Sequence, residues 1–452
     1  MPAAARIEAM GDPAVWRIGA SEAEAAQRRA AASLRRLGLV AGERVVVSVP
    51  TSPDVLALVI GALRCGIVPV VLNPSLLPEE RRSLADDADA ALVVDTPAAV
   101  AELVSADGDE RDLAPHPLAR PMHYTSGTTG RPKGVWSGVL SERDAEALFL
   151  DERDLWSFTA DDVLLVCSPL HHSAPIRFSI SALLSGADVV LVERFDSATV
   201  VDTIRHHRPT ATFMVPSHLQ RLFAAPPEQR DLSSFRLLAH AGEACPAALK
   251  HRAFDEFPEG AVWEFYGSTE GQFTVCGPAE WQARPSTVGR ARPNRRVDVD
   301  DDGQIWCTVP AWARFEYWND PDKTAEAWRG DAFTVGDLGR LDAEGYLFID
   351  GRRDDLIISG GVNVYPAEIE NVLSLVPGVR EIAAFGAVDE RWGERVCIAV
   401  IGDVDDQAIR EAARSHLAPY KRPKDIYRIE SLPRTGTGKI RRSVIARTLG
   451  LE

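Results

Sequence analysis

The chain is poor in residues that support several common classes of site. It contains six cysteines and four methionines among 452 residues, and aromatic residues make up 7%. No two cysteines are close in sequence, and no CxxC or Cys/His spacing typical of a zinc site occurs. We therefore expect reduced thiols with structural roles, and neither a disulfide framework nor a cysteine metal site.

Basic charge is also scarce relative to acidic charge. The sequence has 66 Asp and Glu against 50 Lys and Arg, a formal net charge of −16. Such a balance disfavours wrapping nucleic acid or binding an anionic membrane surface. We expect no nucleic-acid partner, and any polyanionic ligand must be met by a local basic site.

No uninterrupted apolar stretch reaches the length of a membrane span. The most apolar region, residues 55–72, is broken by Arg64, two glycines and Pro69. This pattern predicts a buried helix followed by a strand. The N-terminal stretch `MPAAARIEAMGD` lacks the continuous apolar core of a signal peptide, so we expect a cytoplasmic protein.

Alternating helix and strand patterns are present throughout the first three hundred residues. `SEAEAAQRRAAASLRRLGL` predicts a helix with Ser21 as its N-cap and Gly38 near its end. Later, `DVLLVCSPL`, `ADVVLVE`, `ATFMVP` and `FRLLAHAG` predict short buried strands separated by helix-length segments. This rhythm predicts an α/β fold with mostly parallel sheets covered by helices.

The pattern changes near residue 297. `RVDVDDDGQIWCTV` and `GRLDAEGYLFIDGRRDD` predict antiparallel hairpins, and a compact α+β region with a helix beginning at Pro366 follows. We predict a large N-terminal domain, residues 1–353, with a β-rich subdomain at about 290–353. A small mobile C-terminal domain would comprise residues 354–452.

The segment `YTSGTTGRPKGV`, residues 124–135, is suited to holding phosphate. Its glycines permit close backbone approach, its hydroxyls donate hydrogen bonds, and Lys133 adds a positive charge. It is not the common nucleotide P-loop, because Lys133 follows a proline and precedes a glycine. The residues predict a phosphate site without naming the nucleotide; the alternative is a solvated loop.

Four segments, in order, resemble the motifs of the adenylate-forming superfamily, which includes acyl- and aryl-CoA synthetases, peptide-synthetase adenylation domains and luciferases. The phosphate segment is the first. The others are `EFYGSTEG` (264–271), `VGDLGRLDAEGYLFIDGRRDDLIISGGVNVYPAEIE` (335–370) and `LPRTGTGKIRR` (432–442). The resemblance runs from about residue 25 to the end, and it implies an ATP-dependent, AMP-forming acid–CoA ligase.

The resemblance assigns roles to individual residues. Lys439, Thr269 and Glu270 would be catalytic, Glu270 also as the magnesium ligand, and Asp354 would be the hinge. The residues implied to bind ATP or CoA are Thr125, Ser126, Gly127, Thr128, Thr129, Lys133, Gly242, Glu243, Tyr266, Asp337, Arg352 and Gly361.

The implied chemistry agrees with these residue types. A carboxylate that attacks the α-phosphate brings two anions together, so cations must neutralise the transition state. Magnesium on Glu270 and the ammonium of Lys439 would do so, and Asp337 would accept both ribose hydroxyls. The alternatives are a helix-start acid for Glu270, a turn residue for Asp337 and a solvated charge for Lys439.

Coenzyme A is the acceptor that the C-terminal tail favours. From Tyr420 to Arg442 the chain has eight basic and two acidic residues, a candidate partner for CoA phosphates or a solvated basic face. Gly361 would line the pantetheine tunnel, and Trp392 would cover the CoA nucleotide or be structural. A carrier-protein thiol or another nucleophile, such as nitrite, is the alternative acceptor. A non-catalytic nucleotide-binding regulator is a rival of another class.

The resemblance also implies an acid pocket. Its candidate wall residues are His171, His172, Arg177, Val215, His218, Ala239, Phe265 and Gln272. `HHSAPIRFSIS` contains no aspartate for an α-ammonium group, which favours a small aromatic or medium acyl acid over an α-amino acid. Arg177 either pairs a polar substituent of the acid or lies on a helix surface. Relatives usually have glycine where Pro175 stands here, so we expect the pocket to differ in shape at this position.

Overall fold

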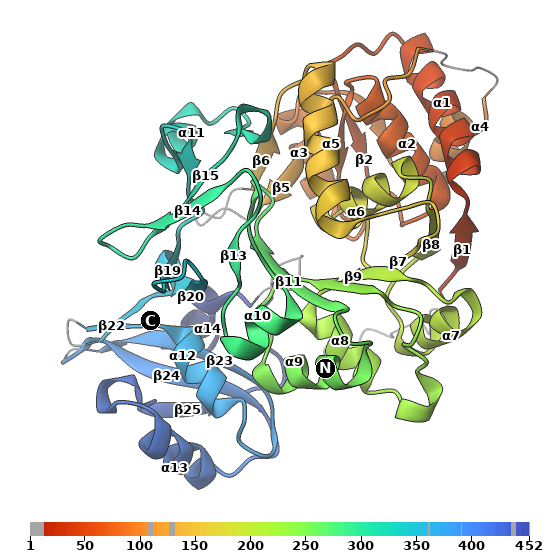
Figure 1. Cartoon of the computed structure of the whole chain (residues 1–452). Helices are drawn as coiled ribbons and strands as arrows, with labels where there is room; N and C mark the ends of the chain where they lie inside the picture. Colours follow the sequence, from red (N-terminus) through yellow and green to blue (C-terminus); the bar gives the residue numbers. More distant parts are fainter. Residues whose placement is uncertain are drawn as a thin grey trace, which may run out of the picture. The chain divides into compact units, whose positions relative to one another are not determined.

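A computed structural model of the chain describes residues 13–106, 112–125, 132–359, 362–389, 391–434 and 440–451. These residues form two compact units, each described separately below (Figure 1). Unit 1 holds the described residues of 13–125, 132–283 and 310–325, and unit 2 those of 284–309 and 326–451. The boundary at residues 353 and 354 was predicted as a hinge between moving domains, and it stays a prediction.

The first sheet of unit 1 is parallel, with the strand order β3-β2-β4. Its strands are β2 (Arg44–Val47), β3 (Val68–Val71) and β4 (Ala90–Val94). The helices of this region are α1 (Ala20–Arg36), α2 (Pro53–Arg64), α3 (Pro78–Asp87) and α4 (Pro97–Ser105). Ser52 caps α2 by accepting a hydrogen bond from the Val55 N–H at 3.2 Å. The predicted buried helix and strand in residues 55–72 are confirmed as α2 and β3.

Helix α1 begins at Ala20, so the prediction that Ser21 is its N-cap was wrong. Gly19 has the extended backbone of an N-cap residue and offers no side-chain cap. The helix can begin there because Glu22 in its first turn and Arg35 and Arg36 in its last turn complement the helix dipole. The predicted end is confirmed, since Gly38 has a φ of +87° that favours glycine.

The second sheet of unit 1 has the order β1-β8-β7-β9-β10-β11-β12 (Figure 1). Its strands are β1 (Val15–Ile18), β7 (Val163–Val166), β8 (Asp188–Val192), β9 (Ala211–Met214), β10 (Leu237–His240), β11 (Val262–Gly267) and β12 (Gln272–Cys276). Strands β7 to β11 pair in parallel, whereas β1 and β12 pair antiparallel with their neighbours. The four predicted strands are confirmed as β7, β8, β9 and β10.

The central strands β7 to β10 are buried on both faces. Leu164 and Val189 belong to one apolar cluster, while Leu165 and Val190 belong to another. This explains why β7 to β10 read as continuous apolar runs. The helices that accompany them are α5 (Glu142–Trp156), α6 (Ser173–Leu184), α7 (Ser197–His207), α8 (Pro216–Phe223), α9 (Ala247–Glu256) and α10 (Pro278–Ala283), with η1 at Pro227–Gln229.

A third, antiparallel sheet in unit 1 joins segments that are far apart in sequence. It contains β5 (His123–Thr125), β6 (Lys133–Trp136) and β16 (Glu316–Tyr317) in the order β16-β6-β5. Tyr317 pairs with Val135, and Trp318 N–H donates to the Gly134 carbonyl at 2.8 Å. The turn η2 (Ala311–Ala313) precedes β16, and α11 (Pro321–Ala327) follows it.

Unit 2 contains hairpins followed by an α+β region, as predicted. Its first strands are β13 (Arg290–Ala291), β14 (Arg296–Val299), β15 (Ile305–Thr308), β17 (Trp328–Arg329), β18 (Ala332–Phe333), β19 (Asp337–Leu341) and β20 (Leu347–Arg352). Strands β14 and β15 form one predicted hairpin and β19 and β20 the other. The turns between them contain Gly303 and Gly345, both with positive φ.

The remainder of unit 2 is a sheet with helices α12 to α14. Its strands are β21 (Ile357–Ser359), β22 (Val362–Val364), β23 (Val379–Asp389), β24 (Gly393–Gly402) and β25 (Asp425–Arg428). Its helices and turns are η3 (Arg353–Asp355), α12 (Pro366–Leu373), α13 (Asp406–His416), η4 (Pro419–Lys421) and α14 (Arg442–Thr448). The helix predicted to begin at Pro366 is confirmed.

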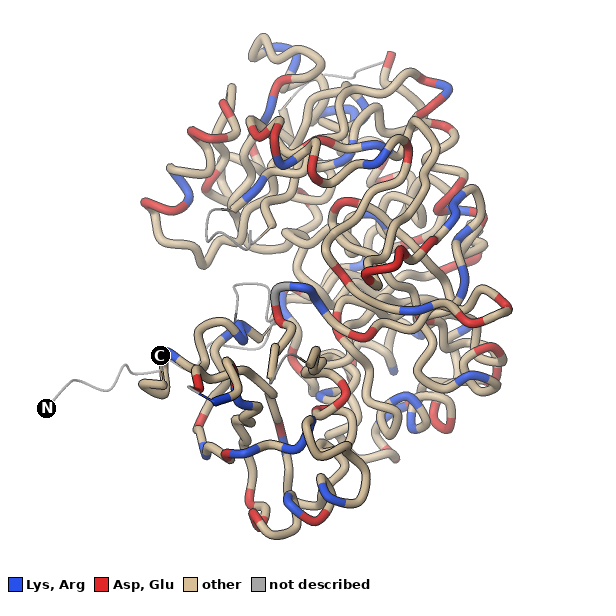
Figure 2. Tube along the Cα trace, turned by 90° about the vertical axis from the view of Figure 1, so that its left-hand side faces the viewer, with Lys and Arg blue, Asp and Glu red and all other residues tan. Residues whose placement is uncertain are grey.

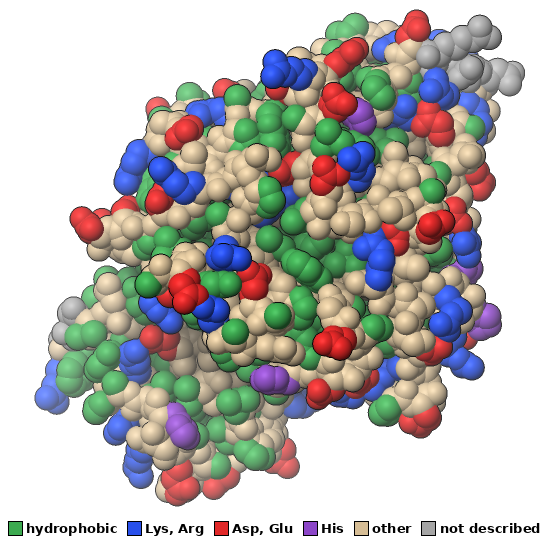
Figure 3. All heavy atoms as spheres, in the orientation of Figure 1, with side chains coloured by type: hydrophobic (Ala, Val, Ile, Leu, Met, Phe, Trp, Pro, Cys, Tyr) green, Lys and Arg blue, Asp and Glu red, His purple; other side chains and the backbone are tan. Residues whose placement is uncertain are grey.

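Side-chain chemistry on the surface is mixed. Acidic and basic residues are both scattered along the tube in Figure 2, and Figure 3 shows charges of both signs among polar and apolar side chains. All six cysteines are free thiols, and Cys245 is the least buried of them. No helix in the described part of the chain is long and apolar enough to cross a membrane.

Candidate active site

Four loops of unit 1 follow the carboxyl ends of parallel strands, where ligands bind in open α/β sheets. Residues 167–172 follow β7, Val215 follows β9, residues 241–243 follow β10, and residues 268–270 follow β11. Because neighbouring parallel strands end at the same edge, these loops place several of the singled-out residues at one edge of the sheet: His171, His172, Val215, Gly242, Glu243, Thr269 and Glu270.

The glycine-rich segment connects β5 to β6. Thr125 ends β5 and Lys133 begins β6, and the two residues are paired across the strands. Gly134 next to Lys133 is closely packed, because a Cβ there would lie 2.2 Å from the terminal methyl of Met122, which would have to move. Ser126, Gly127, Thr128 and Thr129 lie outside the described residues.

Glu270 is held at the end of the loop after β11. Its side chain is buried, and its Oε1 accepts a hydrogen bond from the Tyr317 hydroxyl at 3.0 Å. The Lys133 ammonium lies over the ring of the same tyrosine, 5.4 Å from its centroid. Arg120 donates to the Glu270 carbonyl at 3.2 Å, and Thr269 beside it is half-buried. A carboxylate and an ammonium thus both contact Tyr317, one at its hydroxyl and the other at its ring.

Tyr266, Gly242 and Glu243 lie on adjacent strand ends. Tyr266 is in β11, buried, with its ring centroid 4.7 Å from that of Phe273. Gly242 has a φ of +90°, a conformation that side chains disfavour. The Glu243 carboxylate accepts hydrogen bonds from the Ser217 N–H and hydroxyl, both at 3.2 Å, and so ties the loop after β10 to the start of α8.

The predicted wall residues of the acid pocket come from neighbouring elements, and they differ in burial. His171, His172, Arg177 and Val215 are half-buried, whereas Ala239, Phe265 and Gln272 are buried. Phe265 packs in an aromatic group with Trp156, Phe178 and Phe213. Pro175 is accommodated in the first turn of α6, where a missing N–H costs no helical hydrogen bond.

Arg177 is neither on an open surface nor alone. Its Nε lies 3.1 Å from Oε2 of Glu152 on α5, and its side chain is 20% exposed. Trp156 Nε1–H donates to the same Glu152 oxygen at 3.3 Å. The guanidinium also lies 5.4 Å from the centroid of the Phe265 ring. The positive charge of Arg177 is therefore already balanced.

The histidines near this region are held neutral by burial. Burial lowers the pKa of His123 and that of His171 to about 3, helped by the positive potential of His172. Burial also lowers the pKa of His218 to about 4, with Arg221 and His172 adding to the shift. His218 contacts the Ser168 hydroxyl through Nδ1 at 3.2 Å and stacks on Phe195. These three rings therefore carry no charge at neutral pH.

In unit 2, Asp337 and Arg352 are paired across the β19–β20 hairpin. The Arg352 Nε lies 3.1 Å from Asp337 Oδ1, and the aspartate is buried while the arginine is half-exposed. Gly336, with a φ of +80°, sets the turn before Asp337, and its carbonyl accepts the Arg353 N–H at 2.9 Å. The hairpin thus fixes the Asp337 carboxylate at the start of a strand.

The predicted hinge and lysine segments are partly described. Asp354 lies in η3, and Gly361 and Lys439 lie outside the described residues. Arg442 begins α14 and forms ion pairs with Glu370 at 2.8 Å and Asp355 at 3.1 Å. Residue 442 of the lysine motif is therefore anchored next to the predicted hinge residue.

Three basic side chains of the tail form ion pairs within unit 2. Lys421 pairs with Glu368, Arg428 with Asp406 and Arg434 with Glu381. Lys424 lies over the ring of Trp392, which is 40% exposed. The local excess of positive charge alone therefore does not identify a CoA site.

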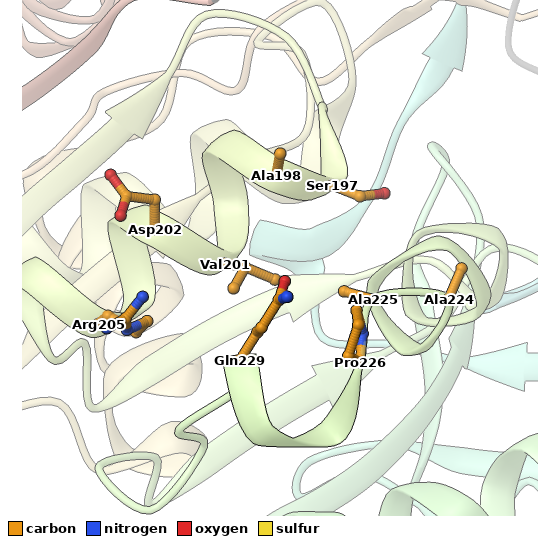
Figure 4. A pocket seen from close by; sticks show the side chains of 9 residues that line it. All are labelled: Ser197, Ala198, Val201, Asp202, Arg205, Ala224, Ala225, Pro226 and Gln229. Atoms are coloured by element: carbon orange, nitrogen blue, oxygen red, sulfur yellow. The ribbon is translucent and has the colours of Figure 1, made fainter.

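A cavity of about 440 Å³ lies in unit 1 among α7, α8 and η1 (Figure 4). Its lining residues are Ser197, Ala198, Val201, Asp202, Arg205, Ala224, Ala225, Pro226 and Gln229. None of the predicted site residues lines it, so it is a separate surface feature.

Sequence reasoning missed Glu152, Tyr317, Arg120 and His123. None of them belongs to a local motif: Glu152 lies in `LDERDLW` and Tyr317 in `FEYWND`. The contacts of Glu152 and Tyr317 form only through the packing of α5 on α6 and the pairing of β16 with β6. The only local feature in the sequence that pointed to Tyr317 was its position just before the `WNDP` turn.

Comparison with known proteins decides the family. The family model of AMP-binding enzymes matches residues 9–309, and that of the AMP-binding enzyme C-terminal domain matches residues 368–439. The chain belongs to the AMP-binding enzyme family. The resemblance to adenylate-forming enzymes is therefore confirmed.

Relatives of this AMP-binding enzyme include named CoA ligases. Indoleacetate–CoA ligase of Aromatoleum aromaticum is 33% identical, over 94% of this chain and 92% of that protein. Long-chain-fatty-acid–CoA ligase FadD13 of Mycobacterium tuberculosis is 31% identical, over 97% of this chain and 95% of that protein. The structure of o-succinylbenzoate CoA synthetase from Bacillus subtilis, in complex with its acyl-adenylate intermediate, matches with a TM-score of 0.83. It shares 26% identity and covers 94% of this chain and 92% of that one.

Proposed function

We propose that this AMP-binding enzyme is an ATP-dependent acid–CoA ligase that releases pyrophosphate and AMP. The observation that carries the proposal is the arrangement of Lys133, Tyr317 and Glu270 in unit 1. The ammonium lies over the tyrosine ring and the buried carboxylate accepts a hydrogen bond from its hydroxyl, directly beside the glycine-rich segment. Such a pair suits a polyphosphate and its accompanying cation.

The first half-reaction is the adenylation of a carboxylic acid. A carboxylate oxygen attacks the α-phosphorus of ATP, the bond between the α-phosphorus and the bridging oxygen breaks, and pyrophosphate leaves. Thr125, Ser126, Gly127, Thr128, Thr129 and Lys133 are proposed to hold the β- and γ-phosphates. Thr269 and Lys439 are proposed to contact the α-phosphate, with Lys439 also reaching the attacking carboxylate.

The nucleoside is proposed to be held by an aromatic ring that stacks on the base and a carboxylate that binds the ribose hydroxyls. Tyr266 would stack on adenine, with Gly242 and Glu243 beside it. Asp337 is suited to accept hydrogen bonds from both ribose hydroxyls, because its carboxylate is fixed by a strand start and by Arg352.

Magnesium fits the chemistry of Glu270. Within the described part of the chain its carboxylate accepts one hydrogen bond, on Oε1, so Oε2 is available to a hard cation. When bound, the ion would neutralise negative charge on the phosphate oxygens. Glu270, fixed by Tyr317 and Arg120, would hold it.

The second half-reaction transfers the acyl group to coenzyme A. The thiolate sulfur attacks the acyl carbon, the bond from that carbon to the AMP oxygen breaks, and the thiol proton passes to solvent. Gly361 is proposed to leave room for pantetheine, and Asp354 is proposed as the hinge of the C-terminal domain.

The acid is proposed to carry no charge besides its reacting carboxylate. Arg177 is already paired with Glu152, and the nearby histidines His123, His171 and His218 are neutral. Phe265 adds an aromatic wall. An aromatic or medium-chain monocarboxylic acid fits these groups better than a dicarboxylic acid or an α-amino acid.

The test is pyrophosphate release across a panel of acids, with and without CoA, with mass spectrometry of the products. Acyl-CoA and AMP that form together only when CoA is present would support the ligase. Pyrophosphate release with an accumulating acyl-adenylate would favour a carrier-protein thiol or another nucleophile. Nucleotide binding without turnover of any acid would favour a regulatory module.

A further inference from the structure

Tyr317 joins the two charged groups that the proposed function uses for phosphate and magnesium. Its hydroxyl donates to Glu270 Oε1 at 3.0 Å, and its ring carries the Lys133 ammonium. The residue is buried, with 8% of its surface exposed, so water competes little for either contact. It does not belong to any of the four sequence motifs.

The backbone of Tyr317 is fixed on both sides. Its strand, β16, pairs with β6, which begins at Lys133, and Trp318 N–H donates to the Gly134 carbonyl. Tyr317 N–H donates to the Thr324 hydroxyl at 2.9 Å, and this hydroxyl donates to the Asp320 carbonyl at 2.9 Å. The ring therefore has a defined place relative to Lys133.

The backbone of Glu270 is fixed independently. Arg120 bridges two carbonyls, those of Glu270 and Arg314, at 3.2 Å each, and so ties the loop after β11 to the segment that leads into β16. Ser268 N–H donates to the Gly271 carbonyl at 2.8 Å, which closes the turn that contains Glu270. With both backbones fixed, the Tyr317 hydroxyl selects the orientation of the Glu270 carboxylate.

We propose that Tyr317 is a positioning residue that orients the Glu270 carboxylate for the magnesium ion of the nucleotide. This inference rests on the proposed function. Without the hydroxyl, the carboxylate loses the hydrogen bond that fixes its orientation, which would lower its affinity for a divalent cation. Partners that orient a metal ligand typically contribute about 10–100-fold in metal affinity.

The test compares wild type with Tyr317→Phe by electron paramagnetic resonance of Mn2+, in the presence of a saturating non-hydrolysable ATP analogue and without acid. We expect Tyr317→Phe to weaken Mn2+ binding about tenfold. The matched control is Tyr427→Phe on β25, outside the four motifs, whose ring centroid lies 6.0 Å from that of Phe385. It should bind Mn2+ as wild type does, and thermal melting of each variant reports folding.

A double variant separates positioning from general damage to the fold. Added to Glu270→Gln, Tyr317→Phe should change Mn2+ binding less than about twofold, because the carboxylate it orients is gone. If Tyr317→Phe lowered Mn2+ affinity a further tenfold in the Glu270→Gln background, the inference would be overturned. Wild-type Mn2+ affinity in Tyr317→Phe alone would overturn it as well. Failure of wild type to bind any Mn2+–nucleotide would instead overturn the proposed function.

Discussion

Arg177 on α6 and Glu152 on α5 form an ion pair beside the ring of Phe265. Glu152 is 7% exposed and Arg177 20% exposed, so the pair is screened weakly by solvent. In the proposed acid pocket, Glu152 therefore cancels a charge that would otherwise attract a second carboxylate.

The first prediction concerns specificity. Glu152→Gln leaves the Arg177 charge unbalanced, so kcat/KM for dicarboxylic acids should rise about tenfold relative to that for aromatic monocarboxylic acids. Asp154→Asn, on the same helix but exposed, serves as the control. An unchanged ratio across the acid panel would show that Arg177 does not face the acid.

The second prediction concerns a buried cluster beneath the strand ends. Lys250 on α9 is almost fully buried, its Nζ lies 3.1 Å from Glu264 Oε2, and it also contacts His240 Nε2. Lys250→Met should lower the free energy of unfolding by about 3–5 kcal/mol, because Glu264 is left buried and unpaired. Urea denaturation measures this loss. The double variant Lys250→Met/Glu264→Leu should recover most of the loss, and equal instability of the two variants would contradict the explanation.

The third prediction concerns pH. Burial lowers the pKa of His123 to about 3, so the native state binds fewer protons than the unfolded chain between pH 6.5 and 3. Above pH 6.5 His123 is neutral in both states and costs no stability. As the pH falls below 6.5, the unfolded chain gains a proton at His123 that the native state does not, so the free energy of unfolding decreases. His123→Gln should therefore show a shallower fall in urea midpoint between pH 6.5 and 4 than wild type, and equal slopes would contradict this.

The fourth prediction concerns the nucleotide. Asp337→Asn should raise the KM for ATP about 10–100-fold in pyrophosphate release, because two charge-assisted hydrogen bonds to the ribose are weakened. Asp350→Asn, in the same hairpin and paired with Arg340, is the matched control. A KM for ATP unchanged by Asp337→Asn would remove this residue from the proposed nucleotide site.

Local patterns in the sequence predicted much of the fold. Strands β7 to β10 were predicted because residues buried on both faces, such as Leu164 and Leu165, leave an unbroken apolar run. The hairpins were predicted from glycines that take positive φ, such as Gly303 and Gly345. Ser21 failed as a cap because Gly19 can begin a helix without a side-chain hydrogen bond.

The partners of site residues could not be predicted in this way. Glu152 and Arg177 lie on different helices, and Tyr317 meets Glu270 only because β16 adds to the sheet of β6. Likewise, Lys421 and Arg434 appeared in the sequence as basic residues available for CoA, whereas each is paired with a glutamate in unit 2. Such pairings depend on tertiary packing, which has no local signature.

The most direct test of the central claim follows an oxygen atom. The acid that turns over best is labelled with 18O in both carboxylate oxygens and incubated with the enzyme, ATP, Mg2+ and CoA. The masses of the products are then measured by mass spectrometry. Carboxylate attack on the α-phosphorus, followed by thiolate displacement, predicts one 18O atom in AMP and none in pyrophosphate. If unlabelled AMP formed while acyl-CoA accumulated, the reaction would not pass through an acyl-adenylate, and the proposed roles of the site residues would be wrong.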